Sequence, residues 1–277
     1  MSFSKARPLV LVGAGKMGGA MLAGWLESGV DPAAILVVDP NPSDELKAMA
    51  AKSGFSHAPG LSDGQIAGVM ILALKPQIMA GALGALAGAV DANTLVISVA
   101  AGTPAAVFEG AFAGAASGTP RVVRVMPNTP SQVGRGMSVG FANAHADADD
   151  RETVDTLMQA IGKTAWVNAE ADINAVTAVS GSGPAYVFYL VEALAAAGVK
   201  AGLSEDLAMT LARQTVCGAG ELLFRSDLPA EQLRRNVTSP NGTTAAALEA
   251  LMAPDGIQPV MDAAVAAAKR RSEELAG

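Results

Sequence analysis

The sequence has few charged residues, two histidines and one cysteine, and each shortage narrows the class of protein it can encode. Only 16% of the 277 residues are charged while 51% are hydrophobic, which excludes an intrinsically disordered chain. The formal net charge of −7 argues against nucleic acid and against an anionic membrane as partners. Because so little charge is available to cover a surface, we expect a globular protein with a large buried subunit interface.

The cysteine and histidine positions exclude further kinds of site. Cys217 has no second cysteine to pair with, so we expect it to serve packing in a reducing compartment. His57 and His145 have no ligand-like neighbours, and we interpret both as surface residues outside any metal site. The N-terminus lacks the apolar core of a signal peptide, and Ser180-Gly-Ser-Gly-Pro184 interrupts the uncharged run 173–191, a poor membrane span. We therefore expect a soluble, cytoplasmic protein.

What the sequence does have is a glycine pattern between an apolar run and a helical segment. The run 9–12 is followed by Gly13-x-Gly15-x-x-Gly18 and then by amphipathic residues. An ordinary glycine turn need not stand between a strand and a helix. A strand, a glycine turn and a helix start in this order favour a dinucleotide-binding unit. Its backbone would hold a pyrophosphate at the helix start. The residues predicted to do so are Gly13, Ala14, Gly15, Lys16, Met17 and Gly18.

Further apolar runs alternate with helical segments up to residue 168. Strands are predicted at 35–39, 69–75, 95–102 and 121–126, with edge strands at 139–141 and 165–167, and helices at 77–90 and 104–112. This alternation predicts an α/β domain over residues 1–168, a mostly parallel, doubly wound sheet covered by helices on both faces.

From about residue 170 alanine-rich helical periodicity replaces the strand-like runs, and we expect a second, all-helical domain over residues 169–277. One helix is predicted from Pro184 to Ala197, with Gly198 as its stop. Glu192 is its only charge, so this helix must be surrounded. So small a helical core cannot supply that cover, and a partner subunit is the expected source.

Polar residues at predicted strand ends and helix starts are the candidate binding groups. Asp39 ends the second strand, 21 residues beyond Gly18, where an acidic residue meets the adenosine ribose. Lys75 ends a strand and is either a phosphate or ribose contact or a solvated lysine. Asn128, between two prolines, is either a site residue or part of a structural turn. The loops 180–184 and 238–244 each open a helix, as simple caps or as anion sites.

Several catalytic patterns are missing from the sequence. It has no Gly-x-Ser-x-Gly elbow, no phosphate-loop lysine motif, no zinc-type cluster and no histidine placed as a general base. A reductase that takes hydride from a nicotinamide and needs little side-chain acid–base help fits these absences.

Four motifs in order resemble those of pyrroline-5-carboxylate reductases. They are Ala73-Leu-Lys-Pro76, Arg121-Val-Val-Arg-Val-Met-Pro-Asn-Thr-Pro130, Thr177-Ala-Val-Ser-Gly-Ser-Gly-Pro-Ala-Tyr186, and Pro229…Leu233…Val237-Thr-Ser-Pro-Asn-Gly-Thr-Thr244…Leu248. The resemblance spans about residues 8 to 275, and its two C-terminal motifs are specific. It implies a Rossmann domain followed by an all-α dimerisation domain, with homodimers that gather into decamers of five dimers. It also implies reduction of 1-pyrroline-5-carboxylate to L-proline by NAD(P)H, the last step of proline biosynthesis.

The resemblance also assigns roles to particular positions. The residues assigned to substrate binding are Ser182, Asp227, Ser239, Gly242 and Thr243. Thr244 is assigned as the catalytic residue beside the ring nitrogen. Those lining the cofactor groove are Ala73, Lys75, Ala100 and Asn128. The implied step is hydride transfer from C4 of the nicotinamide to C5 of the cyclic imine, for which the protein mainly supplies orientation and burial.

Two positions depart from the family pattern. Asp39-Pro40 stands where NADPH-preferring relatives often place a serine or an Asn-Arg pair. A carboxylate there would repel a 2′-phosphate, so we expect a preference for NADH. Asn241 replaces a common glycine, and asparagine tolerates the left-handed backbone that such a loop needs.

Two competing hypotheses remain open. A related reductase of 2-hydroxyacids or of a six-membered cyclic imine would share the glycine loop, although the loop 238–244 favours the proline enzyme. A nucleotide-binding regulatory protein without catalysis would also keep the loop, but the intact Thr243-Thr244 pair speaks against it.

Overall fold

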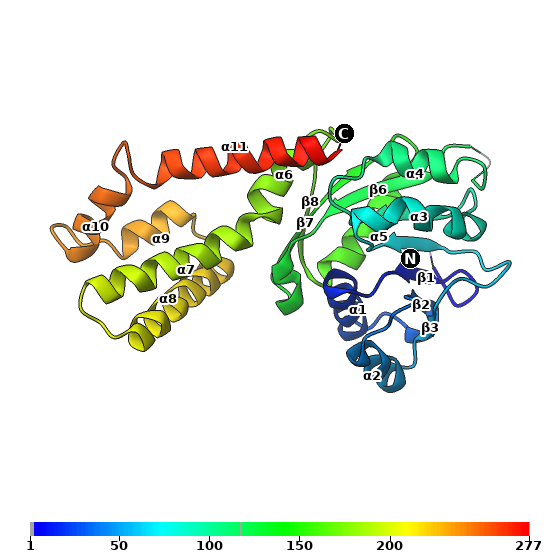
Figure 1. Ribbon diagram of the computed structural model, residues 1–277, viewed down its shortest axis with the longest axis horizontal. Coiled ribbons are helices and arrows are strands. Elements are labelled where there is room, and N and C mark those ends of the chain that lie inside the picture. Colours follow the sequence, from blue (N-terminus) through cyan, green and yellow to red (C-terminus); the bar gives the residue numbers. More distant parts are fainter. Residues whose placement is uncertain (1–2, 117, 277) are drawn as a thin grey trace. The chain divides into compact units, whose positions relative to one another are not determined.

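The computed structural model describes residues 3–116 and 118–276 and divides the chain into two compact units. The first unit comprises the chain up to Gly181 together with the residues from Lys269 onward, and the second comprises Ser182–Ala268 (Figure 1). The predicted domains, 1–168 and 169–277, follow the change in sequence pattern, whereas these compact units divide later, inside a helical stretch. The chain leaves the first unit once and returns to it once.

The first unit is built on an eight-stranded sheet with the order β3-β2-β1-β4-β5-β6-β7-β8. All neighbouring pairs are parallel except β6 and β7. The strands are β1 (Leu9–Val12), β2 (Ile35–Val38), β3 (Ser56–Ala58), β4 (Val69–Leu72), β5 (Leu95–Ser98), β6 (Arg121–Met126), β7 (Gly136–Ala142) and β8 (Gly162–Trp166). The predicted mostly parallel sheet is therefore confirmed, and β7 lies inside the sheet, between β6 and β8, rather than at its edge.

The central strands β1, β2, β4 and β5 are buried along their whole length because the sheet is covered on both faces. Leu9 and Leu11 of β1 pack with α1 (Lys16–Glu27) and α5 (Ala148–Gln159), on the same side as α2 (Asp44–Ser53). Val10 and Val12 point the other way, to α3 (Pro76–Leu86) and α4 (Ala105–Phe112). This two-sided burial is why period-2 alternation is missing from the sequence. Short 3₁₀ turns complete the unit at η1 (Pro32–Ala34), η2 (Ala87–Ala89) and η3 (Thr129–Val133).

Three hydrogen bonds from buried donors fix helices on this sheet. Trp25 of α1 is fully buried, and its indole N–H donates to the Leu157 carbonyl of α5 over 2.9 Å. Glu170 accepts from Arg124 in β6 and from the Ala105 backbone N–H at the start of α4, both at 2.7 Å. Buried donors left unpaired would cost about 1–3 kcal/mol each, so these pairings hold α1, α4 and α5 in one arrangement.

A continuous helical stretch carries the chain from the first unit into the second. It consists of α6 (Asp172–Val176), one turn of π-helix, η4 (Thr177–Gly181), and α7 (Gly183–Lys200). By length and composition alone, residues 172–200 are sufficient to cross a membrane. The return is also helical, within α11 (Ile257–Ala276). The Ser272 hydroxyl of α11 donates to the Asn174 amide oxygen of α6 over 2.8 Å, so both connecting helices are tied together on the first unit.

The second unit is helical, as predicted, and contains α8 (Glu205–Arg225), α9 (Ala230–Asn236) and α10 (Thr243–Leu251) besides α7 and most of α11. The predicted helix stop at Gly198 is wrong, because α7 continues to Lys200. A Cβ at Gly198 would lie 3.2 Å from the Ala208 Cβ, so this glycine lets α8 approach α7. The turn that ends α7 uses Gly202 instead, at φ 103°.

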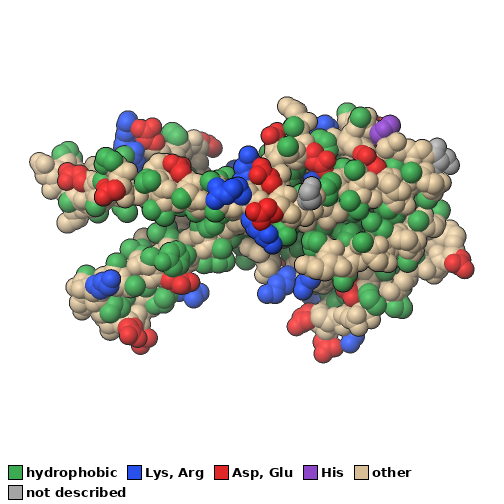
Figure 2. Space-filling view, turned by 45° about the horizontal axis from the view of Figure 1, so that its top comes forward, with side chains coloured by type: hydrophobic (Ala, Val, Ile, Leu, Met, Phe, Trp, Pro, Cys, Tyr) green, Lys and Arg blue, Asp and Glu red, His purple; other side chains and the backbone are tan. Residues whose placement is uncertain are grey.

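Much of the apolar surface of these helices is uncovered within the chain. Phe188 and Tyr189 of α7 are 63% and 70% exposed, and α8 and α11 carry further exposed leucines and valines. Hydrophobic side chains are visible along the helices of this unit in Figure 2. Exposed apolar surface of this extent marks an interaction face.

Candidate active site

A cavity of about 610 Å³ lies at the carboxyl ends of β1, β2 and β4 in the first unit. The predicted cofactor residues Gly13, Gly15, Asp39, Ala73 and Lys75 all line it. This edge of an open parallel sheet is where α/β proteins bind ligands. Several further lining residues carry no motif in the sequence, among them Asn41 and Gly60 in turns and Ile78 on α3.

The three glycines of the first turn each meet a different spatial demand. Gly13 has φ 89°, and a Cβ there would lie 2.9 Å from the Ala73 carbonyl oxygen. A Cβ on Gly18 would collide with the Gly13 carbonyl oxygen. A Cβ on Gly15 would meet nothing within 4 Å, so this position opens toward free space. Two glycines therefore close the strand–helix turn, and the third leaves room for a diphosphate to reach the backbone.

The amino end of α1 is free to bind an anion. Its first helical hydrogen bond runs from the Gly19 N–H to the Gly15 carbonyl, at 2.7 Å. The N–H groups of Lys16, Met17 and Gly18 precede that bond, and Gly15 provides no side-chain cap. Unpaired donors and the positive end of the helix dipole are the features that attract a pyrophosphate.

The Asp39 carboxylate is held at the rim of this cavity by two backbone donors. Its Oδ2 accepts from the Ala14 N–H and its Oδ1 from the Asn41 N–H, both at 2.9 Å. The His57 Nε2 lies 3.1 Å from the Asp39 carbonyl oxygen. His57 is half-buried beside Asp39, whereas His145 is exposed. Asp39 links the glycine turn to the end of β2.

The other predicted cofactor residues do not line this cavity. Ala14, Lys16, Met17 and Gly18 belong to the glycine turn and the start of α1, whereas Ala100 and Asn128 follow other strands. Ala100, 7% exposed, follows β5, and its N–H approaches the Ser98 hydroxyl at 3.3 Å. Asn128 follows β6, where its amide oxygen accepts from the Met137 N–H at 2.8 Å and its amide nitrogen donates to Ser180. Their assignment to the cofactor stays a prediction.

In the second unit, the loop 238–244 forms a tight turn that leads into α10. The Gly242 N–H donates to the Ser239 carbonyl over 3.0 Å, with Pro240 and Asn241 between them. Asn241 has φ 57°, the left-handed conformation expected from its replacement of glycine. A proline at the second position of a four-residue turn and a positive φ at the third position are typical of a type II turn.

The turn leaves the amino end of α10 open. The first helical bond here is from the Ala246 N–H to the Gly242 carbonyl, so the N–H groups of Thr243, Thr244 and Ala245 precede it. Gly242 supplies no side-chain cap. Thr244 is half-buried, and Ser239 and Thr243 are exposed. The amino end of α10 therefore presents backbone N–H donors without helical partners, as the amino end of α1 does.

The remaining predicted substrate residues lie at other helix ends of the second unit. Ser182 immediately precedes α7, and its carbonyl accepts from the Ala185 N–H at 3.0 Å. Asp227 is exposed in the connection between α8 and α9. Their roles stay predictions.

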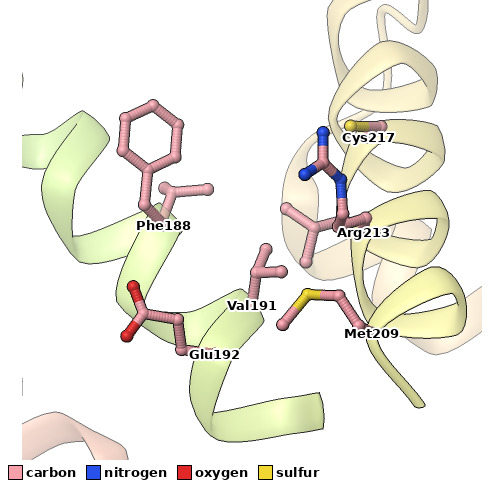
Figure 3. Close-up of a pocket in the computed structure, with 8 residues that line it drawn as sticks. Phe188, Val191, Glu192, Met209, Arg213 and Cys217 are labelled. Carbon is pink, nitrogen blue, oxygen red and sulfur yellow. The ribbon is translucent and has the colours of Figure 1, made fainter. Parts of the chain in front are cut away.

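A second cavity, of about 490 Å³, lies between α7 and α8 (Figure 3). Phe188 and Glu192 line it from α7, and Met209, Arg213 and Cys217 line it from α8. Cys217 is exposed, so its predicted packing role has no support within the single chain. The lining is mostly apolar and belongs to the uncovered surface of the helical unit.

Two family descriptions match this chain. "NADP oxidoreductase coenzyme F420-dependent" matches residues 8–102, which contain the glycine turn and Asp39. "Pyrroline-5-carboxylate reductase dimerisation" matches residues 170–275, which contain α6 to α11. The second description accounts for the apolar surface of these helices as a subunit interface.

The chain is similar over its whole length to proteins named pyrroline-5-carboxylate reductase. One from Pseudomonas aeruginosa is 41% identical over 97% of this chain and 96% of its own length. A solved structure of one from Coxiella burnetii has a TM-score of 0.86 at 33% identity, covering 98% of this chain and 99% of that one. Another, from Plasmodium falciparum and solved with NADP bound, has a TM-score of 0.77 at 28% identity, covering 99% of both chains.

Proposed function

The chain belongs to the pyrroline-5-carboxylate reductase family, and we propose that it reduces 1-pyrroline-5-carboxylate to L-proline with a nicotinamide dinucleotide. The observation that carries the proposal is full-length similarity to such a reductase. In this chain, α1 and α10 also both begin with backbone N–H groups that no side chain caps. The reaction is the last step of proline biosynthesis.

The first unit supplies the dinucleotide site. The open space at Gly15 and the free N–H groups at the start of α1 fit a pyrophosphate. Asp39 accepts hydrogen bonds from hydroxyl groups of the adenosine ribose, and Lys75 offers a positive charge in the same cavity. When bound, the nicotinamide supplies the hydride that reduces the imine carbon.

The second unit supplies the carboxylate site. Ser239, Gly242 and Thr243 form the turn and first helical residue, where free N–H donors face an anion. Thr244, next in that turn, places its hydroxyl at the ring nitrogen. Because a protonated imine is already electrophilic, Thr244 orients the ring and passes on a proton rather than acting as a strong acid. Ser182 and Asp227 complete the substrate side, and Ala73 and Ala100 complete the cofactor groove.

We propose that NADH is preferred over NADPH. Two backbone N–H donors hold the Asp39 carboxylate in the cavity, where a ribose 2′-phosphate would meet a fixed negative charge. At an effective dielectric near 20, like charges about 4 Å apart repel by up to ~4 kcal/mol, less with salt. The relative from Plasmodium falciparum was solved with NADP bound, so the choice is proposed for this chain's own Asp39.

The assembly and location follow from the same family. We propose a cytoplasmic homodimer that covers the apolar faces of α7 and α8, with five such dimers in a decamer. Support for the dimer comes from the dimerisation match over residues 170–275 and from the exposure of Phe188 and Tyr189.

A steady-state assay on 1-pyrroline-5-carboxylate with NADH and with NADPH tests both the proposed reaction and the proposed choice of cofactor. We expect consumption of both cofactors with a higher kcat/KM for NADH. A six-membered cyclic imine in the same assay tests the related reductase, which would turn over that substrate faster. Bound dinucleotide without oxidation by either imine would favour a regulatory protein and overturn the proposal.

A further inference from the structure

We propose that Asn128 is a positioning residue, which holds the π-helical turn η4 through Ser180 instead of contacting the dinucleotide. The Asn128 Nδ2 donates to the Ser180 carbonyl oxygen over 3.1 Å and approaches the Ser180 hydroxyl at 3.3 Å. Its Oδ1 accepts from the Met137 N–H over 2.8 Å. The side chain thus joins the turn after β6, the start of β7 and the π-helical turn η4.

These partners also fix which way the amide faces. The Met137 N–H can only donate, so the Asn128 oxygen must face it. The Ser180 carbonyl can only accept, so the Asn128 nitrogen must face Ser180. An aspartate at position 128 would keep the first contact and place a negative charge against the carbonyl in the second.

The Ser180 carbonyl is available to Asn128 because of a proline. In an α-helix this carbonyl would accept from the N–H four residues later, and residue 184 is Pro184, which has none. Asn128 therefore supplies a donor that the helix cannot. The two family motifs, 121–130 and 177–186, meet in this one contact, although neither motif alone indicates it.

The residues around Ser180 are packed against the same place on the first unit. Ala178 is fully buried, and a Cβ on Gly181 would lie 2.6 Å from the Met126 Cε. The Thr177 hydroxyl donates to the Ile173 carbonyl over 2.8 Å. π-Helical turns often occur at functional sites, and this one ends where the chain leaves the first unit.

The consequence for catalysis rests on the proposed function. Ser182 lies two residues after Ser180 and immediately before α7, and it is assigned to the substrate. A displaced Ser180 moves Ser182 and the first turn of α7, while the glycine turn and Asp39 keep their own contacts. Asn128 variants should therefore affect use of the imine and leave dinucleotide binding intact.

The test compares Asn128→Asp with Ser180→Ala and with Asn168→Asp, a matched change at an exposed loop position of the same unit. Amide hydrogen exchange over residues 177–186 should be about tenfold faster in Asn128→Asp, as expected for loss of one half-buried hydrogen bond. Ser180→Ala keeps the carbonyl contact and should show little change. Kd for NADH, from fluorescence quenching, should stay within about twofold, while kcat/KM for the imine falls about tenfold or more.

The alternative outcomes are distinct. A raised Kd for NADH with unchanged exchange over 177–186 would make Asn128 a direct cofactor contact and overturn the inference. Equal exchange in Asn128→Asp and wild type would also overturn it. If the wild-type protein does not oxidise NADH with the imine, the proposed function fails, and the exchange and NADH-binding measurements still decide whether Asn128 holds Ser180.

Discussion

Thr244 is the residue on which the proposed chemistry depends most directly. It is half-buried in the first turn of α10. It directly follows Thr243, the first of the residues whose N–H groups are assigned to the carboxylate. We expect Thr244→Ala to lower turnover by about tenfold or more, the range for one positioned group, with Kd for NADH unchanged. Thr244→Ser retains a hydroxyl and should keep most of the activity. Near-normal kcat in the alanine variant would remove Thr244 from the mechanism.

Asp39 makes the choice of dinucleotide testable at one position. Replacing it by serine removes the charge that would oppose a 2′-phosphate, so the ratio of kcat/KM for NADH to that for NADPH should fall by roughly tenfold or more. The ratio is measured by parallel steady-state assays at fixed ionic strength. Asp63→Asn, an exposed carboxyl outside the cavity, serves as the control. An unmoved ratio in Asp39→Ser would show that another group selects the dinucleotide.

At the residue scale, the sequence indicates which groups to examine but not what they touch. Glycine spacing located the turn, and distance along the chain located Asp39, because both are consequences of one strand–turn–helix unit. The link from Asp39 to His57 depends on the pairing of β2 with β3, and the link from Asn128 to Ser180 on a fold over 52 residues of chain. Such contacts have no local sequence signature.

The packing of α1 on β1 is controlled by one glycine. Gly18→Ala places a methyl group against the Gly13 carbonyl oxygen, which must push α1 away from the sheet. We expect a loss of about 1–3 kcal/mol in the free energy of unfolding, with weaker NADH binding.

Gly19→Ala is the matched control, because its Cβ meets only the Ala14 carbonyl oxygen, at an ordinary 3.7 Å. Improved helix propensity should make it neutral or more stable by up to about 1 kcal/mol. Urea unfolding of the two variants measures both effects. Equal stabilities would mean that the approach of α1 to β1 is not limited by this contact.

The pair of Arg7 and Asp91 ties the segment before β1 to the segment before β5. Two side-chain contacts of 2.7 Å join them, and the hydrogen bond from Arg7 holds the pKa of Asp91 well below its usual range. The pKa of an aspartate in the unfolded chain is near 3.9. Because the pKa of Asp91 is lower in the folded protein, its carboxylate stabilises the fold above that pH, and this stabilisation is lost as the pH falls. Asp91→Asn should therefore destabilise the protein at pH 7, and the difference from wild type should shrink progressively below pH 4. Urea unfolding at several pH values measures this, and a constant difference would contradict it.

Secondary structure was predictable where burial dominates and not where tertiary contact does. The fully apolar strands β1, β2, β4 and β5 stand out in the sequence because both faces of the sheet are covered. The short strand β3, Ser-His-Ala, carries no apolar run and exists through its pairing with β2. Gly198 resembles a helix stop in the local pattern, because its contact with Ala208 on α8 has no local sequence signature.

The whole molecule depends on an interface that the single chain leaves open. We expect Phe188→Glu, on the exposed face of α7, to weaken dimerisation by on the order of 100-fold, from lost apolar burial and a buried charge. Light scattering coupled to size-exclusion chromatography across protein concentrations measures this. Val133→Glu, equally apolar and 72% exposed in η3 of the first unit, should leave the assembly unchanged. A Phe188→Glu protein that stays assembled at low concentration would place the interface elsewhere.

At this scale the sequence predicted the kind of architecture and the need for a partner. The stretch from Pro184 to Ala197 has Glu192 as its only charge, and a helix that is apolar on all sides must be covered by other protein. This conclusion needs only the sequence of the helix itself. The place where the chain divides was less accessible, because α6 and η4 belong by packing to the first unit although their periodicity matches the helices that follow.

The hydrogen bond between Ser272 and Asn174 joins residues 98 positions apart and clasps both helices through which the chain leaves and re-enters the first unit. Residues 3 and 276 both belong to that unit. Tension applied between them would be carried first by the sheet and by this clasp. The helical unit would remain mechanically shielded until the clasp ruptured, so that its unfolding would follow as a separate, later event.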